Sequence, residues 1–222
     1  MPLAGKGMLL TSMDIDPSDE ADFNRWYDHE HLEERVAIDG FIEARRYIAH
    51  RASPKYLCLY STATIDVLDS PVYRERLANP TNWSKRTMAR FKNMIRAVAR
   101  ITISHGQGRG AALGILRLRP QAGHENKLRA ALKERLDPKA HEGIISMHLI
   151  ESDARLSGPT SEIPAVAGAA DWFLLVDGTR ASAIAPALAA LSSASEQASA
   201  QQISLGTYEL MWDLAKGDIP QM

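Results

Sequence analysis

The sequence lacks the means to form a disulfide within the chain, because it contains one cysteine. It also lacks any apolar run near the roughly 20 residues that a membrane-spanning helix needs. Its first residues, MPLAGKGMLL, form too short an apolar stretch for a signal peptide and are soon followed by acids. An excess of positive charge is missing too, since 26 basic residues face 27 acidic ones. We therefore expect a cytoplasmic protein that binds neither membranes nor nucleic acid.

What the chain has is an ordinary globular composition. It contains 222 residues, of which 45% are hydrophobic and 24% charged, enough for one large domain or two small ones with a sizeable core. The single cysteine, Cys58, falls in the apolar run YLCLY at 56–60. We interpret it as a small core residue rather than a nucleophile.

The hydrophobic pattern predicts two successive sets of elements in the order β-α-β-β-α-β. In the first set we expect strands at 7–15, 41–50, 56–62 and 93–104, and helices at 23–35, 67–77 and 82–91. In the second set we expect strands at 111–118, 143–151, 171–176 and 203–214, and helices at 123–136 and 180–191. The Gly-rich joint HGQGRG at 105–110 separates them, so the predicted units span 1–106 and 107–222.

This element order is that of the ferredoxin-like unit. A four-stranded antiparallel sheet with helices on one side leaves its other side bare, and that face must be buried. Two copies in one chain can bury each other's bare faces. We therefore predict an α+β fold in which two tandem ferredoxin-like units pack sheet to sheet as an intramolecular α/β barrel.

The most informative stretch is the helix predicted at 23–35, FNRWYDHEHLEER. At about 100° per residue, its inward face holds Phe23, Trp26, Tyr27, Glu30, Glu34, Ala37 and Ile38, with His31 at the edge. Ionisable groups among large aromatics must lose water, which is costly unless they are paired or used in chemistry. We therefore expect the functional site around this helix.

His31 is the first catalytic candidate. An imidazole with a pKa near 6.5 can accept and donate a proton at cellular pH. Asp28 and Glu34, three residues before and after it, could orient one ring nitrogen. The alternative is a helix histidine that bridges to solvated carboxylates.

Glu30 is the second catalytic candidate, as a general base in dry surroundings. The alternative is an ion pair with Arg45 or Arg96 across the helix–sheet interface. The run His29-Glu30-His31 does not predict a metal site, because residues two apart on a helix point in nearly opposite directions. We expect His29 on the surface.

Several aromatic and basic residues could bind substrate. The aromatic candidates are Trp26, Tyr27, Tyr47 and Trp83, which could line an aromatic pocket or simply belong to the core. Tyr27 could also stabilise an oxyanion. The basic candidates are Arg45, Arg86 and Arg96, which could bind a carboxylate or phenolate, or neutralise the acid-rich stretch 14–34.

A family resemblance rests on two blocks of the first half. One comprises Phe23, Trp26, Tyr27, Asp28, Glu30, His31 and Leu32, then Gly40-Phe41 and Arg45-Arg46-Tyr47. The other comprises NPTNWSKR at 79–86, then Phe91, Asn93, Met94 and Arg96. Together they resemble the dimeric α/β-barrel superfamily, and within it EthD-like and antibiotic-monooxygenase-like proteins.

The resemblance implies a ligand pocket between the sheet and the helices of one unit. Activities in that superfamily include cofactor-independent oxygenation of aromatics, lactone isomerisation, cyclisation, aldoxime dehydration with haem, and haem degradation. The resemblance therefore implies a pocket but no single reaction. It also allows a further homodimer of the internal pseudo-dimer.

The second half departs from this pattern. Its first helix, GHENKLRAALKERL, has a plain leucine and alanine stripe without a Trp-Tyr pair or a carboxylate–histidine cluster. We interpret His124 as solvated, and His141 and His148 as structural. We therefore expect one active site per chain, in the first half, with the second half as scaffold.

Three functions remain open. The first is a catabolic lyase or isomerase without an organic cofactor, acting on an apolar or aromatic carbonyl, hydroxyl or lactone compound. The second is a cofactor-independent monooxygenase of an aromatic substrate. The third is a haem-binding or non-catalytic ligand-binding protein. We rank the lyase or isomerase first, with His31, Glu30 and Tyr27 as its catalytic residues.

Overall fold

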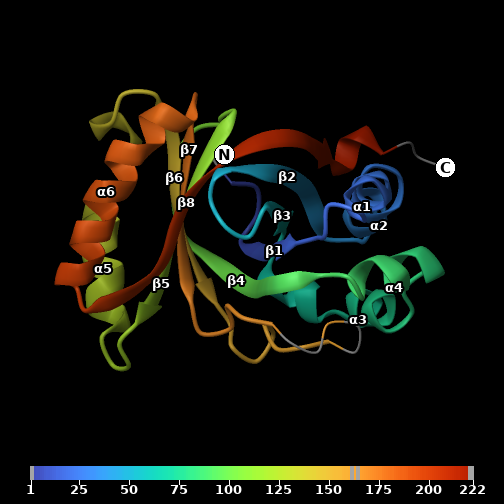
Figure 1. Cartoon of the computed structure of the whole chain (residues 1–222). Coiled ribbons are helices and arrows are strands. Elements are labelled where there is room, and N and C mark those ends of the chain that lie inside the picture. The colour runs from blue at the N-terminus through green and yellow to red at the C-terminus, as the bar shows by residue number, and fades with distance from the viewer. Residues whose placement is uncertain (1–2, 161–162, 164–165, 220–222) are drawn as a thin grey trace.

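Eight antiparallel strands form a closed barrel in the order β1-β3-β2-β8-β5-β7-β6-β4. This computed structural model describes residues 3–160, 163 and 166–219. Helices α1–α4 lie on one side of the barrel and α5 and α6 on the opposite side (Figure 1). Within the described ranges, no helix is both long and apolar enough to span a membrane.

The strands and helices fall close to the predicted positions. The strands are β1 (Gly7–Asp14), β2 (Phe41–Arg51), β3 (Tyr56–Thr62), β4 (Lys92–Gly106), β5 (Ala112–Pro120), β6 (Ile144–Ser152), β7 (Trp172–Gly178) and β8 (Ala200–Ala215). The α-helices are α1 (Glu20–Trp26), α2 (Leu32–Val36), α3 (Pro71–Ala78), α4 (Asn82–Met88), α5 (Glu125–Arg135) and α6 (Ala181–Gln197). A π-helical turn (Tyr27–His31) joins α1 to α2, and 3-10 turns occupy Ile65–Asp69, Pro138–Ala140 and Lys216–Asp218.

The two halves contribute contiguous arcs to the barrel. The first supplies β4-β1-β3-β2 and the second β8-β5-β7-β6, so each arc places its strands in the same relative order. Two seams join the arcs, β2 with β8 and β4 with β6. Every strand therefore has two hydrogen-bonded neighbours, which removes the open edges that a half alone would expose.

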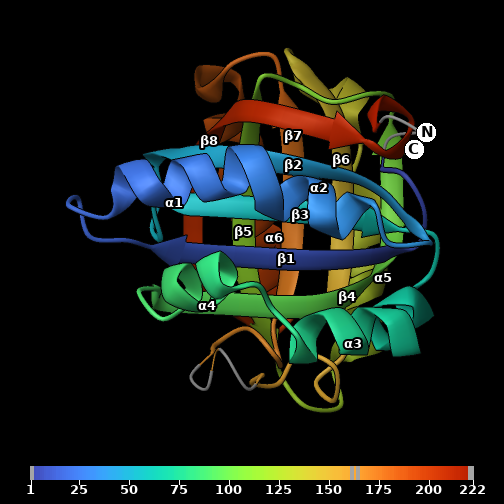
Figure 2. The ribbon, with the colours of Figure 1, turned by 90° about the vertical axis from the view of Figure 1, so that its right-hand side faces the viewer.

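Three apolar cores hold the layers together. One fills the barrel and includes Leu10, Leu59 and Phe173. The other two lie between the sheet and the helices of each half. Figure 2 shows α1 and α2 lying along β2 and β3, with α3 and α4 beside β1 and β4. Side chains alternate along a strand. One face of each strand therefore packs inside the barrel, and the other face packs against a helix layer.

The π-helical turn changes which residues of the predicted helix face inward. It closes with the N–H of Leu32 donating to the carbonyl of Tyr27, five residues back instead of four. This extra residue shifts the inward face by one position. His31, Leu32, Arg35 and Val36 are buried, whereas Glu30 and Glu34 are only partly buried and Ala37 is exposed. The prediction that Glu30, Glu34 and Ala37 face inward is corrected for this reason.

Candidate functional site

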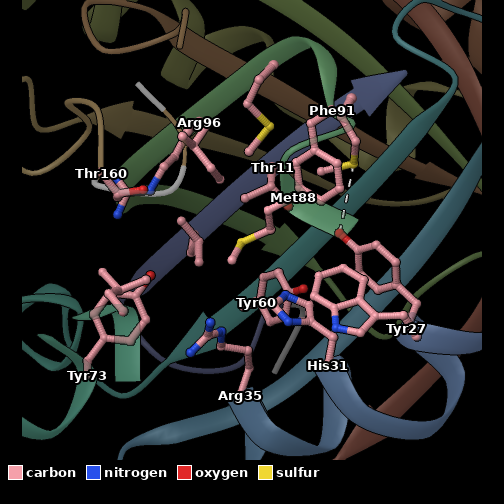
Figure 3. Close-up of a pocket in the computed structure, with 16 residues that line it drawn as sticks. Thr11, Tyr27, His31, Arg35, Tyr60, Tyr73, Met88, Phe91, Arg96 and Thr160 are labelled. Carbon is pink, nitrogen blue, oxygen red and sulfur yellow. Dashed lines mark hydrogen bonds between the residues drawn. The ribbon is translucent and has the colours of Figure 1, made fainter. Parts of the chain in front are cut away.

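A cavity lies between the first-half sheet and helices α1–α4, next to residue 160 of the second half (Figure 3). It contains about 550 Å³ of space free of protein atoms, part of it open to solvent. Its lining is mostly apolar and aromatic: Leu9, Thr11, Met13, Trp26, Tyr27, His31, Arg35, Tyr60, Tyr73, Leu77, Met88, Phe91, Met94, Arg96, Thr160 and Ile163.

His31 forms part of the cavity wall and is 8% exposed. Its ring stacks on Trp26, with centroids 4.0 Å apart and 26° between the planes, and Tyr27 meets it edge-on at 5.2 Å. Its Nδ1 has no hydrogen-bond partner among the described residues. Burial, and then the charges of Arg35 and Arg46, lower the pKa of His31 well below its usual value. The imidazole is therefore neutral at pH 7 and can accept a proton.

Two phenols stand beside the imidazole. The hydroxyl of Tyr27 donates to Sδ of Met13 at 3.8 Å, whereas the buried hydroxyl of Tyr60 has no partner in the described part of the chain. Burial, followed by the neighbouring Cys58, raises the pKa of both tyrosines well above its usual value. Both hydroxyls therefore keep their protons, and that of Tyr60 is available as a hydrogen-bond donor.

Two guanidinium groups also line the cavity. Arg35 is 4% exposed, and its Nη1 has no hydrogen-bond partner among the residues described. Arg96 is held by its Nη1, which donates to the carbonyls of Leu156 at 2.7 Å and Gly158 at 3.2 Å. The lining residues include no aspartate or glutamate, so the two cations make the described wall of the cavity positive.

Arg46 supports the wall from behind. It is fully buried, and its guanidinium lies 4.3 Å from the ring centroid of Tyr27. Nη1 of Arg46 donates to Asp28 at 2.9 Å. Asp28, predicted to orient His31, therefore engages Arg46 instead.

Glu30 lies outside the cavity lining. Its Oε1 accepts hydrogen bonds from Nε1 of Trp26 at 3.1 Å, Oγ1 of Thr81 at 2.6 Å and Oγ of Ser84 at 3.1 Å. These contacts tie the π-helical turn to the start of α4. The carboxylate predicted as a base is thus occupied by structural hydrogen bonds, and the predicted ion pair with Arg45 or Arg96 is not among the ion pairs of the described residues.

Three further predicted residues also lie outside the lining. Glu34 is partly buried, and its Oε1 lies 3.9 Å from Nη1 of Arg35. Trp83 packs against the first-half core, and Arg86 is exposed. Of the predicted site residues, the fold brings His31, Tyr27, Trp26 and Arg96 together around the cavity.

Arg45 and Tyr47 lie on the other face of β2, inside the barrel. Tyr47 belongs to the barrel core, while Arg45 donates to Oε1 of Glu43 at 2.8 Å and approaches Asp177 of β7 within 3.6 Å. The helix-facing positions of this strand are Ala44 and Arg46. The predicted polar and aromatic face of the strand therefore points away from the cavity.

The second half has a filled helix–sheet interface. Leu128, Leu132 and Leu188 are fully or almost fully buried there. A Cβ built on Gly114 would lie 2.3 Å from a side-chain carbon of Ile184, so α6 packs directly on β5. In the described ranges, no three histidine, cysteine, aspartate or glutamate side chains are grouped to hold a metal.

The sequence analysis missed five polar lining residues, Thr11, Arg35, Tyr60, Tyr73 and Thr160, of which Tyr60 and Arg35 matter most for the chemistry. Tyr60 could have been found, because alternation along 56–62 places Tyr56, Cys58 and Tyr60 on one strand face. Arg35 could not, because a regular helix turns it away and only the π-helical turn brings it inward.

A closed barrel of eight antiparallel strands with helices outside is consistent with the dimeric α+β-barrel fold. No protein-family model matches the sequence, and no curated protein matches it. Among solved structures, an anthrone oxidase-like protein superposes with a TM-score of 0.67 at 9% identity, over 96% of this chain and 94% of the other. A protein provisionally named a monooxygenase from Lactobacillus acidophilus gives a TM-score of 0.56 at 8% identity, over 96% and 97%.

A haem-binding protein from Thermus thermophilus gives a TM-score of 0.54 at 7% identity, over 94% of this chain and 92% of the other. At such low identities, these likenesses show a shared fold and no more.

Proposed function

We propose that the protein is a cofactor-independent oxygenase of a small aromatic substrate with an acidic C–H or O–H group. The observation that carries the proposal is the neutral, desolvated imidazole of His31 on the wall of an apolar, aromatic cavity. A neutral imidazole that faces the cavity can take a proton from a bound substrate, and the positive charges of Arg35 and Arg96 favour the anion that is left. This replaces the lyase or isomerase that we ranked first from the sequence.

The reaction needs a base, a stabilised anion and access for oxygen. For a CH₂ group activated by a conjugated carbonyl, His31 takes one proton and leaves a carbanion. The carbanion passes one electron to O₂, and the radical pair combines to form a C–O bond. The resulting peroxide anion takes the proton back from His31 to give a hydroperoxide, and loss of the second C–H proton with cleavage of the O–O bond releases water and leaves a ketone.

The anion formed by proton loss would be stabilised by donors and charges of the wall. We assign hydrogen-bond donation to Tyr60, whose hydroxyl has no partner among the described residues. Tyr27, predicted for this role, directs its hydroxyl to Met13 instead. The charges of Arg35 and Arg96 favour an anion in the cavity. The two structural neighbours described as an anthrone oxidase-like protein and a monooxygenase are compatible with this chemistry.

The surroundings of His31 do not fit a haem, the group that one structural neighbour is described as binding. His31 is the only histidine among the described lining residues of the cavity and is therefore the candidate histidine ligand for the iron. The rings of Trp26, Tyr27 and Tyr60 lie 4.0, 5.2 and 6.3 Å from the imidazole centroid. This crowding leaves a macrocycle no room beside the ring.

The test is oxygen uptake with anthrone as the probe. We expect the purified protein, treated with a chelator, to consume one O₂ per anthrone and to form anthraquinone, with no Soret band in its spectrum. Under nitrogen the reaction should stop. Turnover that continues without oxygen would support the lyase or isomerase instead, and a Soret band would support the haem alternative.

We also propose that residues 1–106 and 107–222 are two ferredoxin-like units that form an internal pseudo-dimer, the first of them similar to EthD-like and antibiotic-monooxygenase-like proteins. The identical strand order of the two arcs supports this division. The filled helix–sheet interface of the second half supports its role as scaffold.

A further inference from the structure

Arg35 presents a structural problem that the oxygenase chemistry alone does not explain. The residue is only 4% exposed, yet Nη1 of its guanidinium has no hydrogen-bond partner in the described part of the chain. A buried charge without good partners is costly, because the water it loses is not replaced. A buried cation without a partner is expected where a bound anion supplies the missing hydrogen bonds and the opposite charge.

The nearest carboxylate, that of Glu34, does not accept a hydrogen bond from the guanidinium of Arg35. Oε1 of Glu34 lies 3.9 Å from Nη1 of Arg35, beyond hydrogen-bond distance, and Oε2 of Glu34 is itself buried without a described partner. The two residues are adjacent on α2, so their side chains diverge by about 100°. Arg35 is therefore directed toward the cavity (Figure 3), while Glu34 lies outside its lining.

The second cation of the cavity reinforces this arrangement. Arg96 on β4 is anchored through one nitrogen to the carbonyls of Leu156 and Gly158, which carry no net charge, and its guanidinium forms no ion pair with a carboxylate of the described residues. With no acid in the described lining, the two arginines give the cavity the charge that an anionic ligand requires.

We propose that Arg35 forms an anion subsite of this cavity and that the natural substrate is an aromatic carboxylic acid, bound by its carboxylate. This inference names the substrate class of the proposed oxygenase and rests on that function only for turnover, not for binding. A planar guanidinium donates two parallel hydrogen bonds to a carboxylate, and such pairs are among the strongest in proteins. The apolar side chains Leu9, Met88 and Phe91 would hold the ring.

The test is equilibrium binding of two probes that do not react, 2-naphthoate and its neutral counterpart 2-naphthamide, measured by calorimetry at pH 7. We expect the wild type to bind 2-naphthoate at least ten-fold more tightly than 2-naphthamide. Arg35→Met should weaken 2-naphthoate about ten-fold and abolish the preference, and Arg35→Lys should keep part of it. Arg25→Met, which removes an exposed arginine of the same helical segment, should bind as the wild type does.

Stability provides a second measurement on the same variants. Because Arg35 lacks good partners, we expect Arg35→Met to unfold at a temperature no lower than the wild type without ligand. A structural ion pair would instead be destabilised by this change. A marked loss of stability in Arg35→Met would overturn the subsite, since Arg35 would then serve the fold.

Binding also separates this inference from the proposed function. Equal binding of the two probes, absence of 2-naphthoate binding at millimolar concentration, or a preference that survives in Arg35→Met would each overturn the subsite. If the preference holds and no oxygen is consumed with any aromatic acid, the subsite stands and the oxygenase fails. If Arg35→Met lowers only kcat on anthrone and the probes bind alike, Arg35 serves the reaction oxyanion and the carboxylate is refuted.

Discussion

The imidazole of His31 lies almost parallel to the indole of Trp26, with ring centroids 4.0 Å apart. The indole nitrogen donates to Oε1 of Glu30 and Oγ of Ser84, each at 3.1 Å, so the surface on which the imidazole rests is held in place. Trp26 is therefore a positioning residue in the proposed chemistry. The stack keeps water from one face of the base and orients its nitrogen atoms relative to the cavity.

Replacing His31 should remove turnover and leave the fold intact. We expect His31→Ala to lower kcat/KM on anthrone by about 100- to 10,000-fold, the usual contribution of a general base. The matched control is His29→Ala, because His29 is exposed on the same turn. Activity of His31→Ala within a few-fold of the control would contradict the assignment, provided that both variants give the wild-type circular dichroism spectrum.

The pH profile of the wild type should show an acidic limb shifted to low pH. Burial and the charges of Arg35 and Arg46 lower the pKa of His31, so the base stays neutral at pH values where an ordinary histidine is protonated. We expect kcat/KM to remain on its plateau at pH 6.5 and to fall only below it. A limb with its midpoint above 6.5 would show that another group, or a protonated His31, controls the reaction.

The stability of the wild type should fall as the pH is lowered below 6.5. The folded state keeps His31 neutral, whereas the unfolded chain binds a proton near the ordinary histidine pKa of 6.5. Stabilisation from the neutral ring is thus complete above pH 6.5 and is lost as the pH falls toward the lowered folded pKa. The slope approaches about 1.4 kcal/mol per pH unit for one such group.

The measurement is urea unfolding of the wild type and of His31→Gln between pH 7 and pH 5. Other groups titrate in both proteins, so the difference between the two curves isolates the imidazole. We expect the wild type to lose its advantage over His31→Gln as the pH decreases. Parallel curves would mean that His31 is protonated as readily in the folded protein as in the unfolded chain.

We expect Glu30 to have a structural role, which can be tested by removing its negative charge and its hydrogen-bond acceptor in two separate variants. Glu30→Gln keeps an oxygen that can accept from Trp26, Thr81 and Ser84, so we expect near wild-type activity and stability. Glu30→Ala removes all three hydrogen bonds and should lower the unfolding free energy by about 2–3 kcal/mol. Thermal unfolding and anthrone turnover distinguish the two roles, since a catalytic base would lose its activity already in Glu30→Gln.

The barrel could be predicted because the hydrophobic pattern of the sequence indicates where its strands and helices lie. Alternating apolar residues mark the strands, and a sheet with helices on one side must bury its other side, which a closed barrel does. The face of each strand was harder to assign. In a barrel covered by helices both faces of a strand are buried, so the aromatic and charged alternation at 43–47 does not say which face meets the cavity. Arg45 and Tyr47 were assigned to the cavity for that reason.

The centre of the site could be predicted only in part. His31 carries its own signal, because an imidazole on a buried helix face must lose water, whereas the pattern left open whether Trp26 belongs to the site or to the core. The π-helical turn has no comparable signal, because it depends on the packing of the whole helix against the sheet. Glu30 was therefore expected further inward than it lies, and Arg35 was left out of the site.

The two seams of the barrel give each half two strand edges that pair with the edges of the other half. The segment 107–111 is the covalent connection between β4 and β5, while β2 with β8 and β4 with β6 supply matched hydrogen-bonding edges. A chain opened in that segment would yield two pieces that can reassemble along these edges. Reassembly would also restore the cavity, since Arg96 of the first piece is anchored by Leu156 and Gly158 of the second. Activity in a split version of this protein would then report directly on the meeting of its halves.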